Sequence, residues 1–357
     1  MPSEDTGPAS QAEAPLAPLP ELSRGELFAF GRRLADATWN LGLPRWFWPE
    51  GVALIGLADF GLIAQADDFR RVKDWADVML ASAHTIEHVN DVTPAAAAAT
   101  AGIDPARLAR YVEWVKLAPR APNGAIEHWK HGLWADTMYM VGVTETRLGA
   151  ITGDPCLVEN AARQYIAHAQ VLQHDRKGLF AHGSHRGETL WNFWGRANAW
   201  AALAAVEILD ASRTLGLTPQ TSPALAEVRQ RLDRQLEALA ACQPEHGVWD
   251  VLVDGQVETA GLVETSAAAG LAAAMIRSAN SPKDLSAASI GVAGRLALRG
   301  VLAYIDAGGV LGRVSAGTIL QLIPFGYAVI RSDRPQLWGQ GLALAAVSAA
   351  LVAGIEP

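Results

Sequence analysis

Segments with helical periodicity follow one another along almost the whole chain. Apolar residues recur at i, i+3 and i+4 in stretches rich in Ala and Leu, which is typical of helices packed on a core. The sequence predicts helices at residues 23–40, 51–64, 69–84, 92–101, 105–117, 133–151, 155–172, 196–214, 222–242, 260–279, 284–305, 315–331 and 338–354. Turn-forming sequences such as GLPRW and TGDP separate them. No alternating pattern of strand length competes, so we expect an all-α fold.

A weak internal repeat indicates how these helices are arranged. The sequences GAIEHW, GLFAHG, GVWDVL and GVLGRV begin at Gly124, Gly178, Gly247 and Gly309, and each leads from a helix and a polar turn into another helix. Repeated helix pairs are typical of helical arrays, either closed or open. Roughly twelve helices close most naturally into a toroid of six hairpins, with an open solenoid as the alternative. In the toroid, the loops at one end surround a central cavity.

Length and composition limit the choice of partners. The chain has 357 residues, half of them hydrophobic and 18% charged, which suffices for one large domain. Its net charge of −8 argues against a nucleic-acid-binding protein and against a polybasic membrane protein. The apolar stretch at 341–354 is too short to span a bilayer convincingly. Cys156 and Cys242 form neither a metal-type spacing nor a disulfide framework, which suits a reducing compartment.

The start of the chain differs in character from the rest. Residues 1–21 are acidic and rich in Pro and Ala, without the basic start and apolar core of a signal peptide. We expect this segment to be disordered and residues 22–357 to form a single domain. The expected location is cytoplasmic, and the sequence assigns no oligomeric state.

The segment HGSHRGETLWNFWGRANAW, which ends at Trp200, is the richest in side chains that bind polar ligands. Buried helix faces are usually aliphatic, whereas indole rings stack on sugar C–H surfaces, and Arg and His bind hydroxyls and carboxylates. The segment combines three tryptophans, two histidines and an arginine: Trp191, Trp194, Trp200, His182, His185 and Arg196. It predicts a site for a planar, polar ligand. In the alternative interpretation, the tryptophans are core residues and Arg196 pairs with a helix carboxylate.

Two acidic residues are candidates for acid–base chemistry. Asp136, in LWADTMYM, begins a strongly apolar helix. The helix dipole favours a carboxylate there, but apolar surroundings raise a carboxyl pKa and make the group a proton donor at neutral pH. Asp91, in NDVTPA, precedes Pro94 and an alanine run, so helix capping explains it as well. Trp46 and Trp48, in RWFWPEGVALIGL, form another aromatic cluster, which packing before a helix explains equally well.

These segments resemble the motifs of the unsaturated uronyl hydrolases, which are glycoside hydrolase families 88 and 105. RWFWPEGVALIGL, NDVTPA, LWADTMYMVG, GLFAHG, WGRANAW and LVETSAAAGLAAAM follow the order of the family's motifs from about Trp46 to the end of the chain. LWADTMYM and WGRANAW look closest to family 105, which includes unsaturated rhamnogalacturonyl hydrolases. The resemblance implies an (α/α)6 barrel, in agreement with the toroid of helical hairpins.

The resemblance also implies roles for individual residues. Asp136 matches the family's general acid/base aspartate, Asp91 its second active-site carboxylate, and His182 the histidine of its GLFxH loop. Trp46 resembles an aromatic wall residue. The substrate-binding pattern W-x-R-x-x-x-W is matched by Trp194, Arg196 and Trp200. The short loop GSHRGETL departs from the family, so we expect a different outer subsite, with His185 of this loop as a further substrate-binding candidate.

The implied reaction is the hydration of a vinyl ether. Polysaccharide lyases leave a 4,5-unsaturated uronic acid at the non-reducing end of an oligosaccharide. Protonation at C4 gives a cation at C5, water adds there, and the resulting hemiketal opens and releases the rest of the saccharide. The resemblance thus implies a glycosidase for unsaturated uronyl oligosaccharides, disaccharides above all, that needs no metal or organic cofactor. In it, Asp136 gives and then takes a proton, and Asp91 positions water or the sugar.

Three other functions stay open from the sequence. One is a hydrolase of saturated uronides on the same barrel. Another is a sugar epimerase on the same toroid, with His182 and His246 as its acid/base pair. The third is a helical-repeat interaction protein without catalysis, which would place Asp136 and Arg196 far apart.

Overall fold

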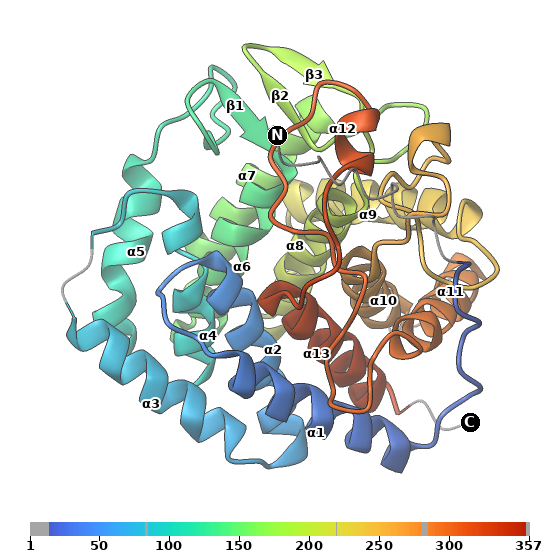
Figure 1. The fold of residues 1–357 in the computed structure, drawn as a ribbon. Coiled ribbons are helices and arrows are strands. Elements are labelled where there is room, and N and C mark those ends of the chain that lie inside the picture. The colour runs from blue at the N-terminus through green and yellow to red at the C-terminus, as the bar shows by residue number, and fades with distance from the viewer. Residues whose placement is uncertain (1–13, 83–84, 219, 280–284, 355–357) are drawn as a thin grey trace, which may run out of the picture.

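The computed structural model describes residues 14–82, 85–218, 220–279 and 285–354, and these residues form a closed ring of helix pairs (Figure 1). Within them, the inner ring is made of α2 (Trp48–Ala64), α4 (Pro94–Thr100), α6 (Ala135–Thr152), α8 (Gly195–Thr214), α10 (Thr265–Ala279) and α13 (Leu337–Val352). Each inner helix packs against the next, and α13 packs against α2. The predicted (α/α)6 barrel is therefore confirmed, and the open solenoid is wrong.

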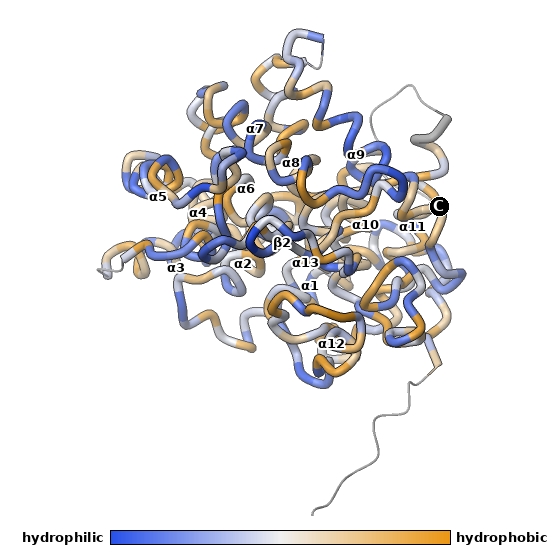
Figure 2. The backbone as a smooth tube through the Cα atoms, turned by 90° about the horizontal axis from the view of Figure 1, so that it is seen from above, coloured by the Kyte–Doolittle hydropathy of each residue, from blue (hydrophilic) through white to orange (hydrophobic). Residues whose placement is uncertain are grey.

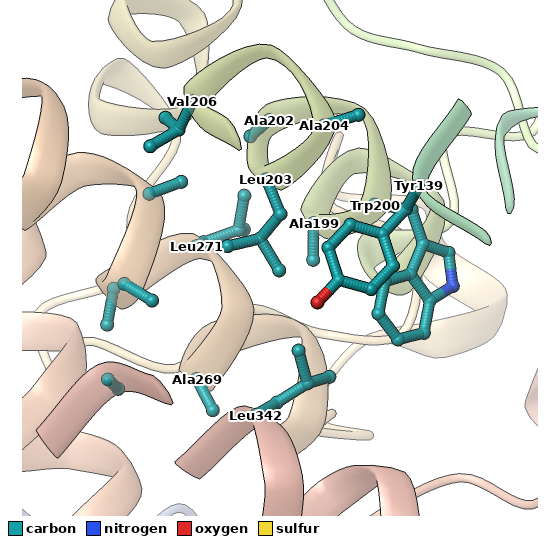
Figure 3. Close-up of a cluster of buried hydrophobic side chains, with 14 of the residues drawn as sticks. Tyr139, Ala199, Trp200, Ala202, Leu203, Ala204, Val206, Ala269, Leu271 and Leu342 are labelled. Atoms are coloured by element: carbon teal, nitrogen blue, oxygen red, sulfur yellow. The ribbon is translucent and has the colours of Figure 1, made fainter. Parts of the chain in front are cut away.

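An outer layer of helices surrounds this ring, and each outer helix precedes its inner partner in the chain. The outer helices are α1 (Arg24–Leu41), α3 (Asp68–Ala81), α5 (Pro105–Leu117), α7 (Pro155–Leu172), α9 (Pro223–Ala241) and α11 (Leu285–Leu302). They are amphipathic, as α9 illustrates by burying Leu225, Val228 and Leu232 among charged residues that are partly exposed. The inner helix α8 is buried almost all round, because it packs between the outer layer and the barrel interior. Figure 3 shows this interior, where Leu203, Leu271 and Leu342 meet from three inner helices.

Small residues bring the inner helices close together. A Cβ atom on Gly56 of α2 would lie 2.4 Å from the carbonyl oxygen of Gly341 on α13. A Cβ atom on Gly341 would in turn lie 2.3 Å from the carbonyl oxygen of Val52. The seam that closes the ring therefore requires glycine on both helices.

The four glycines of the internal repeat all lie in the loops that lead from an outer helix to an inner one. Their φ angles range from +71° at Gly178 to +87° at Gly309, a left-handed conformation that favours glycine. The repeat is thus confirmed as a recurring loop at one end of the barrel.

The predicted helix at residues 315–331 is wrong. Only α12 (Phe325–Ala328) is helical in this segment, which we call the strap (residues 315–331). Ile319, Leu322 and Ile323 supplied the helical pattern, but they are exposed instead of packed on a core. The strap is held to the barrel by tertiary contacts, among them a hydrogen bond from Asn192 Nδ2 to the carbonyl of Gln321 (2.9 Å).

Short elements that the sequence did not predict also lie at this end. β1 (Gly132–Trp134), β2 (Gly183–His185) and β3 (Glu188–Leu190) form an antiparallel sheet in that order, with Trp134 opposite Gly183 and His185 opposite Glu188. Two 3₁₀ turns accompany them, η1 (Val89–Asp91) and η2 (Val257–Thr259). Among the described residues, no helix combines the length and the apolar character needed to cross a membrane.

The start of the described chain differs from the expected disorder of residues 1–21. Residues 1–13 lie outside the described residues, but residues 14–21 run beside α11. The backbone N–H of Leu16 donates to the Tyr304 hydroxyl (2.8 Å) and that of Leu19 to the Arg299 carbonyl (3.1 Å). These acceptors order a segment whose composition alone favours disorder. The extent of the domain, residues 22–357, stays a prediction.

Candidate active site

Most of the candidate residues lie where inner helices begin. Asp136 is the second residue of α6, Arg196 the second residue of α8, and Trp338 the second residue of α13. Glu264 directly precedes α10. Because every inner helix follows an outer one, these N-terminal ends meet at the same end of the barrel, beside the strap.

Asp136 and His182 form the centre of this group. Oδ2 of Asp136 lies 3.6 Å from Nε2 of His182, and the Asp136 side chain is 14% exposed. Burial raises the pKa of Asp136 to about 7, although the Arg196 charge and the Trp200 indole lower it. Burial and the nearby Arg196 hold the pKa of His182 well below its usual range, so this ring is neutral at pH 7. The site thus pairs a carboxyl that keeps its proton near neutrality with an uncharged imidazole.

Arg196 is bound on two sides by protein acceptors. Its Nη1 donates to Glu264 Oε1 (3.2 Å) and to the Ser315 carbonyl (2.8 Å), and its Nη2 donates to the Ala316 carbonyl (2.9 Å). The guanidinium lies 4.4 Å from the centre of the Trp194 ring. In the alternative interpretation, Arg196 pairs with a carboxylate. Its terminal nitrogens do so, because Nη1 contacts Glu264. Its main structural effect is to tie the strap to α8.

Trp194 and Trp200 are core residues by burial, with exposed fractions of 1% and 0%. Trp200 stacks on Tyr139 at 5.0 Å between ring centres, as Figure 3 shows, so Tyr139 takes the place of a sugar on that face. Trp194 packs at 4.3 Å from the ring of His182. Both tryptophans are nevertheless part of the site, because they surround the Asp136–His182 pair.

Several buried polar atoms near Asp136 lack a hydrogen-bond partner. Within the described part of the chain, six buried atoms at the site have no hydrogen-bond partner: Asp136 Oδ2, His182 Nε2, Trp194 Nε1, Trp200 Nε1, Arg196 Nε and Trp338 Nε1. Buried polar atoms are usually satisfied, because an unmade hydrogen bond costs about 1–3 kcal/mol. Their concentration makes this cluster the candidate site for a polar ligand.

Asp91 and Trp46 form a second group next to the first. Oδ2 of Asp91 accepts hydrogen bonds from the backbone N–H groups of Glu87 and His88, both at 2.9 Å, so this oxygen caps a turn. The indole of Trp46 donates to the Asp91 carbonyl (3.0 Å) and stacks on Trp75 and Tyr111. Trp46 is 7% exposed. Packing and the positioning of Asp91 therefore account for Trp46 in the structure.

Aromatic rings connect the two groups. His88 lies 4.9 Å from His128, His128 stacks on Trp134 at 4.5 Å, and Trp134 lies 5.1 Å from His182, all between ring centres. Trp129, which is 54% exposed, covers His88 at 4.3 Å. The candidate carboxylates Asp91 and Asp136 thus belong to one continuous cluster.

Two residues of the His182–Trp200 segment lie apart from this cluster. His185 is exposed at the end of β2, opposite Gly132 in the sheet. Trp191 is 47% exposed and packs on His174 at 5.0 Å. The tryptophan-rich segment therefore divides into an inner half at the site and an outer half on the surface.

The sequence missed several residues that complete the site. The Tyr327 hydroxyl lies 2.7 Å from Nδ1 of His182, but Tyr327 belongs to the strap, which the sequence predicted as a helix. Glu264 lies in the motif LVETSAAAG, whose glutamate received no role. His128 stands eight positions before Asp136 in a loop that offered no periodic signal. Within the described ranges, no group of three or more His, Cys, Asp or Glu side chains is placed to hold a metal ion.

Comparisons with known proteins find relatives that match most of this chain. The chain is 29% identical over 341 residues to the unsaturated rhamnogalacturonyl hydrolase YesR of Bacillus subtilis, covering 87% of this chain and 91% of the relative. A possible member of the GH105 family from Klebsiella pneumoniae has a similar structure, with a TM-score of 0.82, 24% identity and coverage of 94% and 96%. The unsaturated glucuronyl hydrolase of Bacillus sp. GL1, which degrades glycosaminoglycan, matches with a TM-score of 0.66, 17% identity and coverage of 90% and 95%.

The family assignment rests on most of the chain. The family model described as Glycosyl Hydrolase Family 88 matches residues 35–352, which include all six inner helices and every residue of the cluster around Asp136. The protein therefore belongs to Glycosyl Hydrolase Family 88.

Proposed function

We propose that this protein is a glycosidase that removes a 4,5-unsaturated uronic acid from the non-reducing end of lyase-generated oligosaccharides. The observation that carries the proposal is the Asp136 carboxyl: its pKa is raised to about 7, and its unpartnered Oδ2 faces the unpartnered Nε2 of His182. A general acid works best when its pKa lies near the operating pH. The names of YesR and of the Bacillus sp. GL1 enzyme point to the same class of substrate.

The proposed reaction begins with protonation. Protonated Asp136 gives its proton to C4, and the electrons of the C4–C5 double bond form the new C–H bond. The positive charge at C5 is shared with the ring oxygen. Asp136, now a carboxylate, accepts a proton from water as the water oxygen bonds to C5, which restores the acid. One carboxyl thus serves both proton transfers, and neighbouring His182 stays neutral throughout.

Ring opening completes the reaction. The C5 hemiketal forms a ketone by breaking the bond from C5 to the ring oxygen, and that oxygen takes a proton. C1 is then a hemiacetal, which forms an aldehyde and releases the remaining saccharide as an alcohol. The net change is the addition of one water molecule. The rule that relates carboxylate separation to anomeric stereochemistry does not apply, because the chemistry occurs at C4 and C5.

The remaining residues are assigned supporting roles in this proposal. His182 and Trp194 contact the unsaturated sugar, and Arg196 contributes its unpartnered Nε and its charge. Asp91, with Trp46 behind it, positions water or the sugar beside Asp136. The Trp200 indole lowers the pKa of the Asp136 carboxyl, and we assign it the role of orienting that group.

The other functions considered for the sequence have less support. If the protein were a helical-repeat interaction protein, Asp136 and Arg196 would lie far apart. They lie close enough for the Arg196 charge to lower the pKa of Asp136. The epimerase requires His182 and His246 to work as a pair. However, His182 faces Asp136 and Tyr327, whereas the charged neighbour of His246 is Asp250.

A panel of unsaturated disaccharides, produced by lyases from different uronans, tests the proposal. We expect the vinyl-ether absorbance to disappear while a free sugar is released in equal amount. A chromogenic saturated glucuronide is the control, and we expect no cleavage of it. Turnover of the saturated substrate with no loss of vinyl absorbance on the panel would reject hydration and support a hydrolase of saturated uronides.

A further inference from the structure

An exposed apolar surface on the strap is not used by the proposed chemistry. Among the described residues, five large apolar side chains within residues 319–329 are more than half exposed. They are Ile319 (68%), Leu322 (78%), Ile323 (60%), Phe325 (60%) and Val329 (65%). α12 contacts η2, where Val257 is 82% exposed. We call these six residues the strap patch. Figure 2 shows hydrophobic stretches of the chain around α12, between hydrophilic ones, at the edge of the molecule.

The exposure of the strap patch is fixed by contacts on the other side of the strap. Tyr327 is fully buried, with its hydroxyl at 2.7 Å from His182 Nδ1. Arg196 holds the carbonyls of Ser315 and Ala316, and Asn192 holds that of Gln321. Because the polar groups of the strap are bound inward, its apolar side chains are presented outward on a firm support.

The size of the strap patch suits a protein interface. Monomeric proteins rarely expose a contiguous apolar patch of more than a few hundred Å². A side chain of this type offers on the order of 100 Å² of apolar surface, since its full burial is worth about 1.5–3 kcal/mol at roughly 25 cal/mol per Å². Because the six side chains are 60–82% exposed, they offer on the order of 400 Å² together, which suits the apolar centre of an interface in which each partner buries ~800 Å².

We propose that the strap patch is the interface of a homodimer, in which the strap of one copy packs against the strap of a second copy. An apolar patch matches an identical patch across a two-fold axis, which is the commonest symmetry of homo-oligomers. The six side chains carry no charge and no hydrogen-bonding group, so they do not suit a saccharide rich in hydroxyls and carboxylates. An acidic membrane surface is disfavoured by the net charge of −8. This proposal does not depend on the proposed function.

Sedimentation velocity of the full chain, from about 1 to 100 µM, tests the proposal. We expect the wild type to sediment with twice the monomer mass of 37.9 kDa toward the upper end of this range. In the double variant Leu322→Lys/Phe325→Lys, like charges meet across the two-fold axis, and we expect at least tenfold weaker association. Leu117→Lys, which changes an 85% exposed leucine at the end of α5, is the matched control and should associate like the wild type.

Further measurements separate the possible outcomes. Circular dichroism and thermal unfolding establish that each variant is folded, which its exposed positions predict. A wild type that stays monomeric over the whole range overturns the proposal. A dimer that persists in the folded double variant also overturns it, because another surface must then form the interface. Binding of the monomeric wild type to vesicles of neutral phosphatidylcholine, lost in the double variant, would instead assign the patch to a lipid surface.

Discussion

The hydroxyl of Tyr327 lies 2.7 Å from Nδ1 of His182, and the opposite nitrogen of the same ring faces Asp136 at 3.6 Å. A residue of the strap thus fixes the orientation of the ring beside the proposed acid. Because His182 is fully buried, no water replaces this partner at the same atom without rearrangement. The strap is therefore as much a part of the proposed site as the inner helices are.

Tyr327→Phe tests this relationship. The variant keeps the ring and removes only the hydroxyl, so His182 loses the partner of Nδ1. A hydrogen bond contributes about 0.5–1.5 kcal/mol, so we expect kcat to fall by roughly 2- to 12-fold, with a displaced pH profile. Tyr304→Phe is the control, because its hydroxyl bonds the backbone of Leu16 on the outside of the barrel. Equal losses and unchanged pH profiles in both variants would show that Tyr327 only stabilises the fold.

Asp136→Asn is the most direct test of the chemistry. The amide has nearly the same shape but gives no proton to C4 and takes none from water. We expect kcat to fall by at least about 10²–10⁴-fold, the usual contribution of general acid–base catalysis. Asp104→Asn is the control, since an asparagine still caps α5 by accepting the backbone N–H of Ala106. A folded Asp136→Asn enzyme with more than about a tenth of the wild-type kcat would exclude Asp136 as the acid.

The pH dependence of kcat/KM follows from the pKa of Asp136. The protonated carboxyl is the active form, and burial raises its pKa to about 7. We therefore expect kcat/KM to be level on the acid side of neutrality and to fall about tenfold per pH unit above pH 7. The profile is measured on an unsaturated disaccharide, with a check that the enzyme stays folded. An alkaline limb near pH 4, as for an ordinary aspartate, would contradict the assignment.

Arg196→Ala should affect stability before it affects substrate binding. The family resemblance suggests a loss in KM, but the structure places Arg196 between Glu264 and the strap. Removing one partner of a buried ion pair typically costs about 3–5 kcal/mol. We expect a loss of this size in the free energy of unfolding, measured by chemical denaturation. Arg32→Ala is the control, because its ion pair with Asp68 is half exposed on the arginine side and is worth about 1 kcal/mol or less.

Glu145→Gln should stabilise the protein at alkaline pH. Glu145 is 1% exposed, and burial raises its pKa to about 7, above the ordinary value of 4.5. The folded state thus holds a proton that the unfolded state releases, so stability decreases as pH rises from about 4.5 through 7. The glutamine removes this penalty, on the order of 2–4 kcal/mol above pH 7, and has little effect below pH 4.5. Glu159→Gln, at a half-exposed position on α7, should change little at either pH. A Glu145→Gln effect that is independent of pH would contradict the raised pKa.

The barrel was predictable from sequence because its inner helices carry a strong local signal. Segments such as α13 are apolar almost all round and rich in Ala, and only a helix buried on every side accommodates that pattern. The sequence of the strap also has a helical pattern of apolar residues, but most of the strap is not helical. Its conformation depends on Arg196, which lies more than a hundred residues earlier and binds the carbonyls of Ser315 and Ala316. No local pattern contains that contact.

The residues of the candidate site were likewise only partly predictable from the sequence. Asp136 was identifiable, because an acidic residue stands in an otherwise apolar helix start, and its raised pKa agrees with that interpretation. Tyr327 and Glu264 are fixed to the site only by folding, so the sequence around them gave no chemical reason to select them. The partners of Arg196 were not predictable for the same reason, because they come from other parts of the chain. Its role in substrate binding stays a prediction.

The glycine seam between α2 and α13 has a consequence for how the molecule is made. Gly56 and Gly341 lie near opposite ends of the chain, and their helices meet only when the last one is present (Figure 1). A ribosome must therefore release almost the entire polypeptide before the barrel can shut, and until then the apolar flank of α2 has no cover. Contacts between such distant segments form slowly, and unfinished chains are prone to aggregate. We therefore expect chains of this protein that are still being synthesised to need protection from aggregation, because the first and last inner helices of the ring are neighbours.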